Sequence, residues 1–163
     1  MTGESADVPA WTVSEMLLEE TGNAMQAGDF ETFLCAFALP YTHATEEGVI
    51  ELDNACDLHA IFESVRGHYA QAGVTRVIRM CIAAEYDGPD KINATHEAHI
   101  FVRDQRVRQP FPVLSQLERG GPLGWRIRAS NYAVSQDPGH ADALMPLVLP
   151  SELAKRLRKK KDD

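Results

Sequence analysis

His96 is the residue of this 163-residue chain that is best suited to acid–base chemistry. It stands between Ala94 and Ala98 in an alternating run over residues 91–103, on the side of the expected strand that is otherwise apolar. Because a free imidazole titrates at about pH 6.5, such a histidine can accept or donate a proton near neutral pH. We therefore expect His96 to act as a general acid or base, with room for a ligand beside its small neighbours. The alternative is a core histidine that is hydrogen-bonded to a neighbouring group.

Three further polar residues are expected to assist His96. Tyr41 and His43 share one parity in a short β-prone run, and Asn131 shares the apolar side of the last β-prone run. Their hydroxyl, imidazole and amide groups can hydrogen-bond a carbonyl or hydroxyl group of a ligand. A surface position for His43 and a backbone-binding role for Asn131 stay open as alternatives. The predicted catalytic set is thus His96, Tyr41, His43 and Asn131, and the predicted ligand contacts are Thr45, Met80, Tyr86 and Trp125.

The sequence predicts neither a metal site nor a cofactor. His96 and His99 are three positions apart, so on a strand they point to opposite faces and cannot bind one ion. The three cysteines include no Cys-x-x-Cys pair, which argues against a zinc site and against a disulfide framework. No glycine-rich phosphate loop, redox pair or Ser-His-Asp order stands out.

Three helices are expected in the first half of the chain, before the strand that holds His96. Gly28 can adopt the left-handed conformation that ends a helix, and Asp29 can cap the next helix through its carboxylate. Thr12 and Glu15 fit a capping box at the start of the first helix. Pro40 marks the end of the second, because a helix rarely includes the residue before a proline. The predicted helices cover residues 13–27, 30–38 and the run between a cap at Asp53 and Gly73.

Strands follow the helices. A short hairpin turning at Gly48 precedes the third helix, and four long β-prone runs come after it. Short turns join these runs, which predicts an antiparallel meander. The side that faces away from the helices mixes polar and apolar residues, including Arg79, Leu114 and Tyr132, and we expect it to form a homodimer interface. The four runs cover residues 74–86, 91–103, 107–118 and 125–134.

Composition limits the class of partner. The formal charge of −8 and the isoelectric point near 5.2 argue against nucleic acid or an anionic membrane as the main partner. The acidic N-terminus does not read as a signal peptide, and no run is long enough to span a membrane, so we expect a cytoplasmic protein. Residues 1–10 are predicted to be a flexible tail, and residues 136–163 a C-terminal extension that ends in a short basic helix.

The order of these elements resembles the NTF2-like (SnoaL-like) superfamily. The resemblance is carried by residues 25–37, by residues 48–53 with the helix that follows them, and by residues 124–128, and it defines a domain over 11–135. It implies an α+β fold in which a cone-like curved antiparallel β-sheet wraps around three N-terminal helices, with a pocket inside the cone. It also implies that the outer sheet face makes a dimer.

The resemblance narrows the chemistry as well as the fold. Steroid isomerases of this superfamily use a base carboxylate where this chain has Thr45, an acid in a strand corresponding to residues 111–117, and a tyrosine in the first helix. This chain has none of these groups, so we do not expect that mechanism. We expect instead a pocket protein that acts, as a lyase or isomerase, on a small apolar organic molecule by general acid–base chemistry. The alternative is a non-catalytic dimeric domain for ligand binding or assembly.

Overall fold

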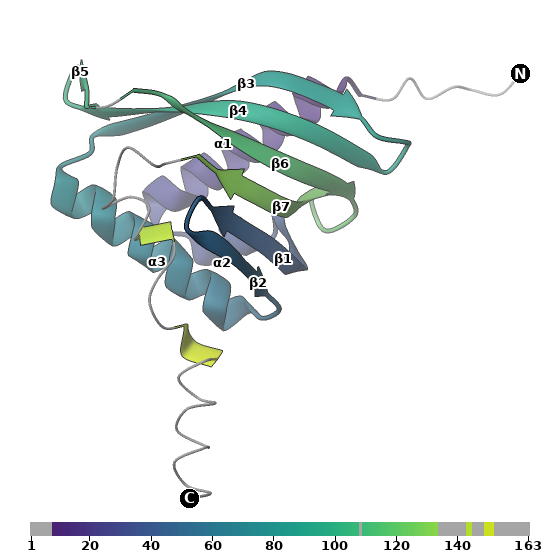
Figure 1. Ribbon diagram of the computed structural model, residues 1–163, viewed down its shortest axis with the longest axis horizontal. Coiled ribbons are helices and arrows are strands. Elements are labelled where there is room, and N and C mark those ends of the chain that lie inside the picture. Colours follow the sequence, from purple (N-terminus) through teal and green to yellow (C-terminus); the bar gives the residue numbers. More distant parts are fainter. Residues whose placement is uncertain (1–7, 108, 134–142, 145–148, 152–163) are drawn as a thin grey trace, which may run out of the picture.

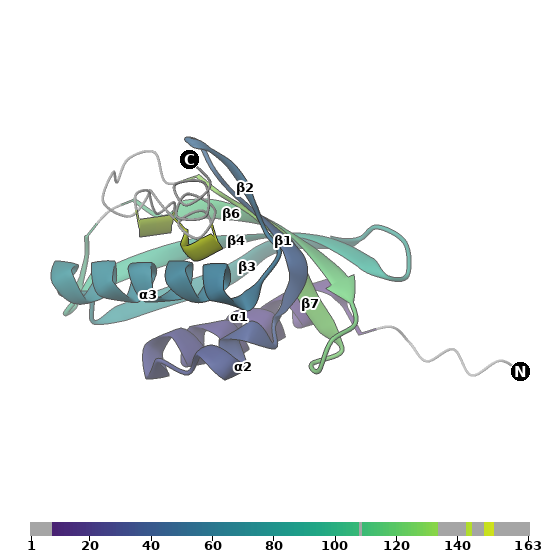
Figure 2. The same cartoon turned by 90° about the horizontal axis from the view of Figure 1, so that it is seen from below.

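Three helices lie against one face of a seven-stranded sheet in the computed structural model (Figure 1). The structure describes residues 8–107, 109–133, 143–144 and 149–151. The helices are α1 (Ala10–Ala27), α2 (Phe30–Leu34) and α3 (Ala55–Ala72). Helices α1 and α3 contact each other on the same side of the sheet (Figure 2). Within the described residues, no helix has the length and apolar character needed to cross a membrane.

The junction between α1 and α2 confirms the predicted signals. Gly28 ends α1 with a φ of 72°, in the left-handed region that favours glycine. Asp29 caps α2, since its Oδ1 accepts a hydrogen bond from the Thr32 amide at 3.2 Å. The Arg66 guanidinium of α3 lies so close that a Cβ at position 28 would stand 2.8 Å from its Nη2. Glycine is therefore required here both by the turn and by the packing of α3 against it.

The start of α1 differs from the prediction. The helix begins three residues earlier, at Ala10, and Pro9 occupies the N-cap position without a side-chain hydrogen bond. The predicted capping box of Thr12 and Glu15 therefore does not form. Glu15 has a tertiary role instead, because its Oε1 accepts a hydrogen bond from the Cys81 amide at 2.8 Å.

The second and third helices also have shifted ends. Helix α2 stops at Leu34, and the first strand already begins at Phe37, so Pro40 lies within a strand and does not end the helix. Helix α3 is capped by Asn54 in place of Asp53, with Asn54 Oδ1 accepting from the Asp57 amide at 2.9 Å.

The sheet is mixed rather than wholly antiparallel. Its strand order is β2-β1-β7-β6-β4-β3, with the short β5 paired to β4. The predicted meander is confirmed for the antiparallel pairs of β3, β4, β6 and β7, whereas β1 and β7 run parallel. The strands are β1 (Phe37–Thr45), β2 (Gly48–Leu52), β3 (Arg76–Tyr86), β4 (Lys91–Val102), β5 (Gln105–Arg106), β6 (Phe111–Arg119) and β7 (Trp125–Tyr132).

A register shift in β7 decides which side chains face the helices. Leu117 of β6 pairs with Ile127, but the preceding Gln116 pairs with Ala129, which leaves Arg128 as an extra residue. Since side chains alternate along a strand, one extra residue exchanges the two faces beyond it. The later residues of β7 consequently point opposite to the direction that uninterrupted alternation predicts.

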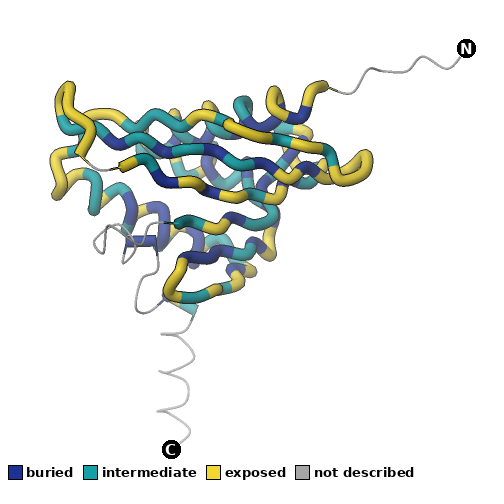
Figure 3. Tube along the Cα trace, turned by 45° about the horizontal axis from the view of Figure 1, so that its top comes forward, coloured by how far each residue is buried: buried dark blue, intermediate teal, exposed yellow. Residues whose placement is uncertain are grey.

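Strand β3 also differs from the expected orientation. Arg79 pairs with Ala98 and Cys81 pairs with His96, so these β3 residues share the helix-facing side with their partners. Met80, between them, points outward. A second register shift, between Cys81 and Ala83, exchanges the faces again toward the end of the strand. In β4, by contrast, buried positions alternate with more exposed ones, and buried and exposed segments are distributed over the molecule as Figure 3 shows.

The core fills the space between the helices and the sheet. Four phenylalanines tie α2 and α3 to β1, with the Phe33 ring 4.8 Å from Phe62 and 4.7 Å from Phe37 between centroids. Phe30 packs edge-on against Phe62 at 5.4 Å. The phenylalanines at positions 30, 33 and 37 thus pack on one side, although Phe37 belongs to β1 and not to α2. The largest fully buried apolar side chains include Leu17, Tyr41, Leu52, Leu58, Phe62, Ile92, Ile100 and Val113.

Candidate functional site

Polar side chains from four strands gather on the helix-facing side of the sheet. They come from two pairs of neighbouring strands, β1 with β7 and β4 with β3, which β6 separates. Such a group within an apolar core is costly unless its members have hydrogen-bonding or charged partners. The interior cluster, as we name it, consists of Tyr41, His43, Arg79, His96, Ser130 and Tyr132.

Tyr41 and His43 form a hydrogen-bonded chain. His43 Nε2 lies 2.7 Å from the carbonyl oxygen of Leu144, and a carbonyl can only accept, so Nε2 carries the ring proton. The other nitrogen, Nδ1, then accepts from the Tyr41 hydroxyl at 3.2 Å. Burial lowers the pKa of His43 to about 4 and raises the pKa of Tyr41 well above its usual value. Both side chains are therefore neutral at pH 7.

His96 is buried without a hydrogen-bond partner. Its exposed fraction is 6 %, and none of the described residues hydrogen-bonds to its ring. Burial lowers the pKa of His96 to about 3, and the charge of Arg79 lowers it further. The ring is therefore neutral, and its unprotonated nitrogen is available as an acceptor. The predicted inward orientation is confirmed, whereas the alternative of a hydrogen-bonded core histidine does not describe this residue.

Arg79 and Tyr132 complete the interior cluster. Arg79 is half-buried as a residue, and burial of its guanidinium is the main reason that its pKa is lowered. Its Nη2 donates to the carbonyl oxygen of Leu18 at 2.6 Å and to Thr21 Oγ1 at 2.7 Å. The Tyr132 ring lies 5.3 Å from that of His43, and burial raises the pKa of its hydroxyl while Arg79 lowers it.

Sequence reasoning placed Arg79 and Tyr132 on the outer face, and this was wrong for both. The shift at Arg128 turns Tyr132 inward, and the register of β3 turns Arg79 inward. No local pattern marks either event. One signal was available for Arg79. An arginine in an otherwise apolar run indicates that its side chain has a partner, because arginine is rarely buried without one.

Two other predicted site residues lie outside the cluster on the opposite face. Asn131 was expected to face inward, but the register shift in β7 makes it point away from the helices, where it is exposed. Met80 was expected to contact a ligand, but it points outward with 45 % of its surface exposed. Its neighbour Arg79 takes the inward position.

The remaining predicted ligand contacts are on the inner side but differ in place. Thr45 is buried, and its Oγ1 accepts from the Glu47 amide at 3.2 Å in the β1–β2 turn. Tyr86 packs against Trp125 with 6.0 Å between ring centroids, and its hydroxyl donates to the carbonyl oxygen of Val8 at 2.5 Å. Tyr86 and Trp125 thus meet near the start of α1 rather than beside His43.

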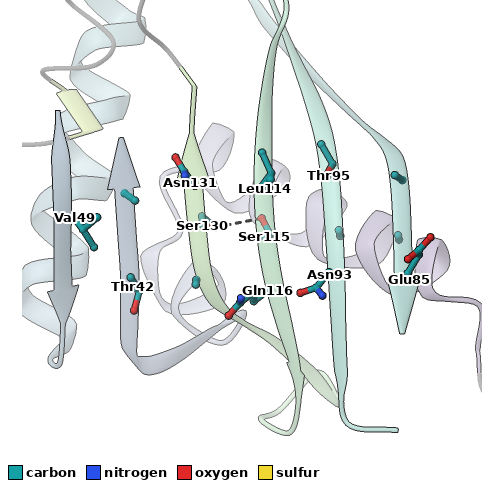
Figure 4. Close-up of a pocket in the computed structure, with 15 residues that line it drawn as sticks. Thr42, Val49, Glu85, Asn93, Thr95, Leu114, Ser115, Gln116, Ser130 and Asn131 are labelled. Atoms are coloured by element: carbon teal, nitrogen blue, oxygen red, sulfur yellow. Dashed lines mark hydrogen bonds between the residues drawn. The ribbon is translucent and has the colours of Figure 1, made fainter. Parts of the chain in front are cut away.

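An open groove of about 620 Å³ lies on the outer face of the sheet (Figure 4). Asn131 contributes to it, but His96 does not. Hydroxyl, amide and carboxylate groups alternate across the strands with alanines. The structure therefore separates the predicted catalytic set, with three members inside and one outside. The residues labelled around the groove are Thr42, Val49, Glu85, Asn93, Thr95, Leu114, Ser115, Gln116, Asn131 and Ser130, which is buried and also belongs to the interior cluster.

Comparison with known proteins decides the fold. No protein-family model matches the chain, and no curated protein matches its sequence. Solved structures do match. An NTF2-like protein of unknown function from Shewanella oneidensis superposes with a TM-score of 0.53 at 7% identity, over 74% of this chain and 95% of that one. The chain has the NTF2-like fold.

Other structures with this NTF2-like, or cystatin-like, architecture agree. A domain of unknown function with a cystatin-like fold from Nostoc punctiforme covers 96% of this chain and 99% of its own, with a TM-score of 0.59 and 12% identity. The protein Aln2 from a Streptomyces species gives a TM-score of 0.60 at 16% identity, over 77% and 91% of the two chains. At such identities the likeness establishes the fold alone. The interior cluster occupies the side of the NTF2-like sheet on which the sequence resemblance placed the pocket.

Proposed function

We propose that this chain binds a small, largely apolar organic molecule on the helix-facing side of its sheet and acts on it as a lyase or isomerase. The observation that supports this is His96, a neutral and buried imidazole that lacks a hydrogen-bond partner among the described residues. Buried polar groups are normally paired, so an unused acceptor beside tyrosines and a cation is suited to a ligand.

The proposed chemistry is a proton transfer at carbon. His96 takes a proton from the carbon next to a ligand carbonyl, and the electron pair of the broken C–H bond moves toward the carbonyl oxygen. Tyr132 is the hydrogen-bond donor proposed for that oxygen as it gains negative charge, because the Tyr41 hydroxyl already donates to His43 and His43 Nε2 donates to Leu144. A negative charge close to His96 raises the pKa of the imidazole, so the weak base of the free protein becomes a stronger one during the reaction.

Exchange of carbon-bound hydrogen in D₂O tests this proposal without knowledge of the natural substrate. The probes are α-tetralone and acetophenone, two small apolar ketones, and proton NMR measures loss of their α-hydrogen signals. We expect the protein to accelerate exchange of at least one probe, and His96→Gln to slow it by about 100-fold or more. His99→Gln, a change on the opposite face of the same strand, is the matched control and should leave the rate unchanged. Equal rates for the unmodified protein and His96→Gln would contradict the role of His96.

A second function, that of a dimeric binding or assembly domain, is favoured by a different observation. Large apolar side chains stand exposed on β2, β3 and β6, namely Val49, Ile82 and Leu114, and Val49 and Leu114 flank the groove. Exposed apolar groups that gather on one face are typical of a protein interface. We propose that a second copy of the chain covers them.

Light scattering at micromolar concentration tests the dimer. We expect a dimer for the unmodified chain and a monomer for Leu114→Asp, because a buried carboxylate without a partner opposes association. Trp11→Asp is the control, since Trp11 is equally exposed but belongs to α1. A monomer for the unmodified chain would overturn this second proposal and leave the interior cluster unaffected.

A further inference from the structure

We propose that the ligand of the interior cluster is a small organic acid whose carboxylate pairs with Arg79. This inference rests on the proposed binding side, but it does not require that His96 transfers a proton. It identifies the chemical class of the ligand as a monocarboxylate with an apolar body. Three features of Arg79 support the inference: its contacts, its charge and its hydrogen-bond donors without an acceptor.

The chain makes room for the Arg79 guanidinium at the boundary between β3 and α1. Its strand partner on β4 is Ala98, which has a small side chain. On α1, a Cβ at Gly22 would stand 3.1 Å from Arg79 Nη2, closer than side chains normally approach. A small residue on each side thus allows the cation to lie under the sheet rather than in solvent.

Arg79 has no negative partner in the part of the chain that the structure describes. The groups that act on its charge are the hydroxyls of Tyr69 and Tyr132, and no carboxylate is among them. Glu15 is the acidic residue of α1 that approaches β3, but its Oε1 accepts from the Cys81 amide at 2.8 Å. A buried cation without a counter-ion is strongly unfavourable, so it is retained where a ligand supplies the missing charge.

The donors of Arg79 fit one carboxylate. A guanidinium has five N–H donors in a planar fork, and the two hydrogen bonds to α1 both use Nη2. No hydrogen bond joins Nε or Nη1 to an acceptor among the residues described, and each can donate a charge-assisted hydrogen bond to a carboxylate oxygen. One carboxylate also balances one buried positive charge, whereas a phosphate dianion would leave an excess of negative charge.

The cluster around Arg79 fits the rest of such a molecule. His96 is close enough for the charge of Arg79 to affect its ring, and Ala94, Ala98 and Val113 beside it are buried and apolar. In the proposed complex the apolar body of the ligand contacts these side chains of β4 and β6 while its carboxylate meets Arg79. A ligand bound in this way brings its negative charge toward His96 as well.

Matched acids and amides test the inference. The probes are benzoate and 3-phenylpropionate, compared with benzamide and 3-phenylpropionamide, and binding is measured by two-dimensional NMR titration at pH 7. We expect at least one acid to bind at least tenfold more tightly than its amide, and Arg79→Met to remove that preference. Arg79→Lys should keep part of it, because the positive charge remains but the guanidinium donors are lost. Equal binding of acid and amide, or an unchanged preference in Arg79→Met, would overturn the inference.

The control variant is Arg76→Met, which removes an exposed arginine from the same strand. The guanidinium carbon of Arg76 lies 5.0 Å from the centroid of the Phe101 ring. Arg76→Met should keep the preference for acids. The NMR spectrum of each variant reports whether it is folded. If Arg79→Met does not fold, Arg79→Gln, which also removes the charge, replaces it, and a folded Arg79→Gln with the full preference for acids would overturn the inference and leave Arg79 as a clamp between α1 and β3.

The same probes separate this inference from the proton-transfer proposal. His96→Gln should bind the acids within about threefold of the unmodified protein while losing exchange activity toward ketones. If exchange is absent but acids are preferred, the ligand class stands and the reaction fails. If exchange depends on His96 but acids and amides bind equally, the reaction stands and the ligand class fails.

Discussion

The two faces of this one sheet carry similar residue types in opposite physical settings. On the outer face, Asn93, Gln116 and Asn131 are exposed, and water satisfies their amides at little cost. On the helix-facing side, Tyr41 and His43 are almost fully buried, and their pKa values are displaced by burial. Polar composition alone therefore does not mark a chemical site. What distinguishes the inner face is that its polar groups lie among buried residues, where hydrogen bonds and charges act more strongly than in water.

The largest difference between the faces should appear when an apolar side chain is removed from each. Phe62 is fully buried against Phe30 and Phe33, and Phe62→Ala is expected to cost about 3–5 kcal/mol of unfolding free energy. Leu114 is 54 % exposed, and Leu114→Ala should change the stability of a monomer by less than about 0.5 kcal/mol. Chemical denaturation at two protein concentrations measures both. A large, concentration-dependent loss for Leu114→Ala would show that the outer face is an interface rather than a solvent face.

The pH dependence of stability should come from the inner histidines. In the folded protein the pKa of His43 is about 4, below its usual value of 6.5, so the unfolded chain binds the proton more readily. The contribution of neutral His43 to stability is then fully present above about pH 6.5, and it is lost as the pH falls toward 4. One pKa unit corresponds to about 1.4 kcal/mol, which gives a loss of about 3 kcal/mol from His43 alone. His96 adds a loss of the same sign that continues toward pH 3.

Denaturation curves between pH 7.5 and 4 measure this slope. His43→Gln should flatten it, because the titrating group is removed, even if the variant is less stable at pH 7. His59→Gln is the control, since His59 is exposed and lies 3.6 Å from Glu63 on the surface of α3. A slope that is unchanged in His43→Gln would mean that burial does not set the protonation of the inner face.

The fold was largely predictable because its signals are local. Gly28 and Asp29 mark the α1–α2 junction, and both roles are confirmed. The alternation in β4 places His96 inward correctly, since the pairing of β4 with β6 is regular along its whole length. The end of α2 was wrong because Phe37 continues the helical spacing of apolar residues, while the pairing of β1 with β7 is a tertiary effect.

The candidate site was less predictable because it depends on strand register. One inserted residue at Arg128 moves Asn131 out of the site and brings Tyr132 into it. The sequence of β7 has no glycine or proline at that point to announce a bulge. The contact of Leu144 with His43 joins residues 101 positions apart, and no spacing rule reaches that far. The predicted N-terminal tail and the basic helix of the C-terminal extension fall largely outside the described residues.

The smallest expected effect concerns the residues near the C-terminus that belong to the inner side. Ser151 Oγ donates to Asp57 Oδ2 at 2.5 Å, and the Ser151 amide donates to Oδ1 at 3.0 Å. Asp57 is buried in the first turn of α3, so its oxygens need these partners. Ser151→Ala removes one bond to a charged acceptor but keeps the amide bond, and we expect a loss of about 1–2 kcal/mol by chemical denaturation.

Ser64→Ala, a change later in the same helix, is the matched control and should alter stability by less than about 0.5 kcal/mol. Ser151 and His43 share no contact. If Ser151→Ala nevertheless weakens the hydrogen bond of His43 to Leu144, the NMR signal of the His43 ring will shift. That shift would show that residues 143–144 and 149–151 act together as part of the inner face. A loss of stability without the shift would show that Ser151 stabilises only the start of α3. No loss of stability would mean that the buried Asp57 carboxylate has sufficient partners without the Ser151 hydroxyl. Residues 149–151 would then not contribute to the inner face.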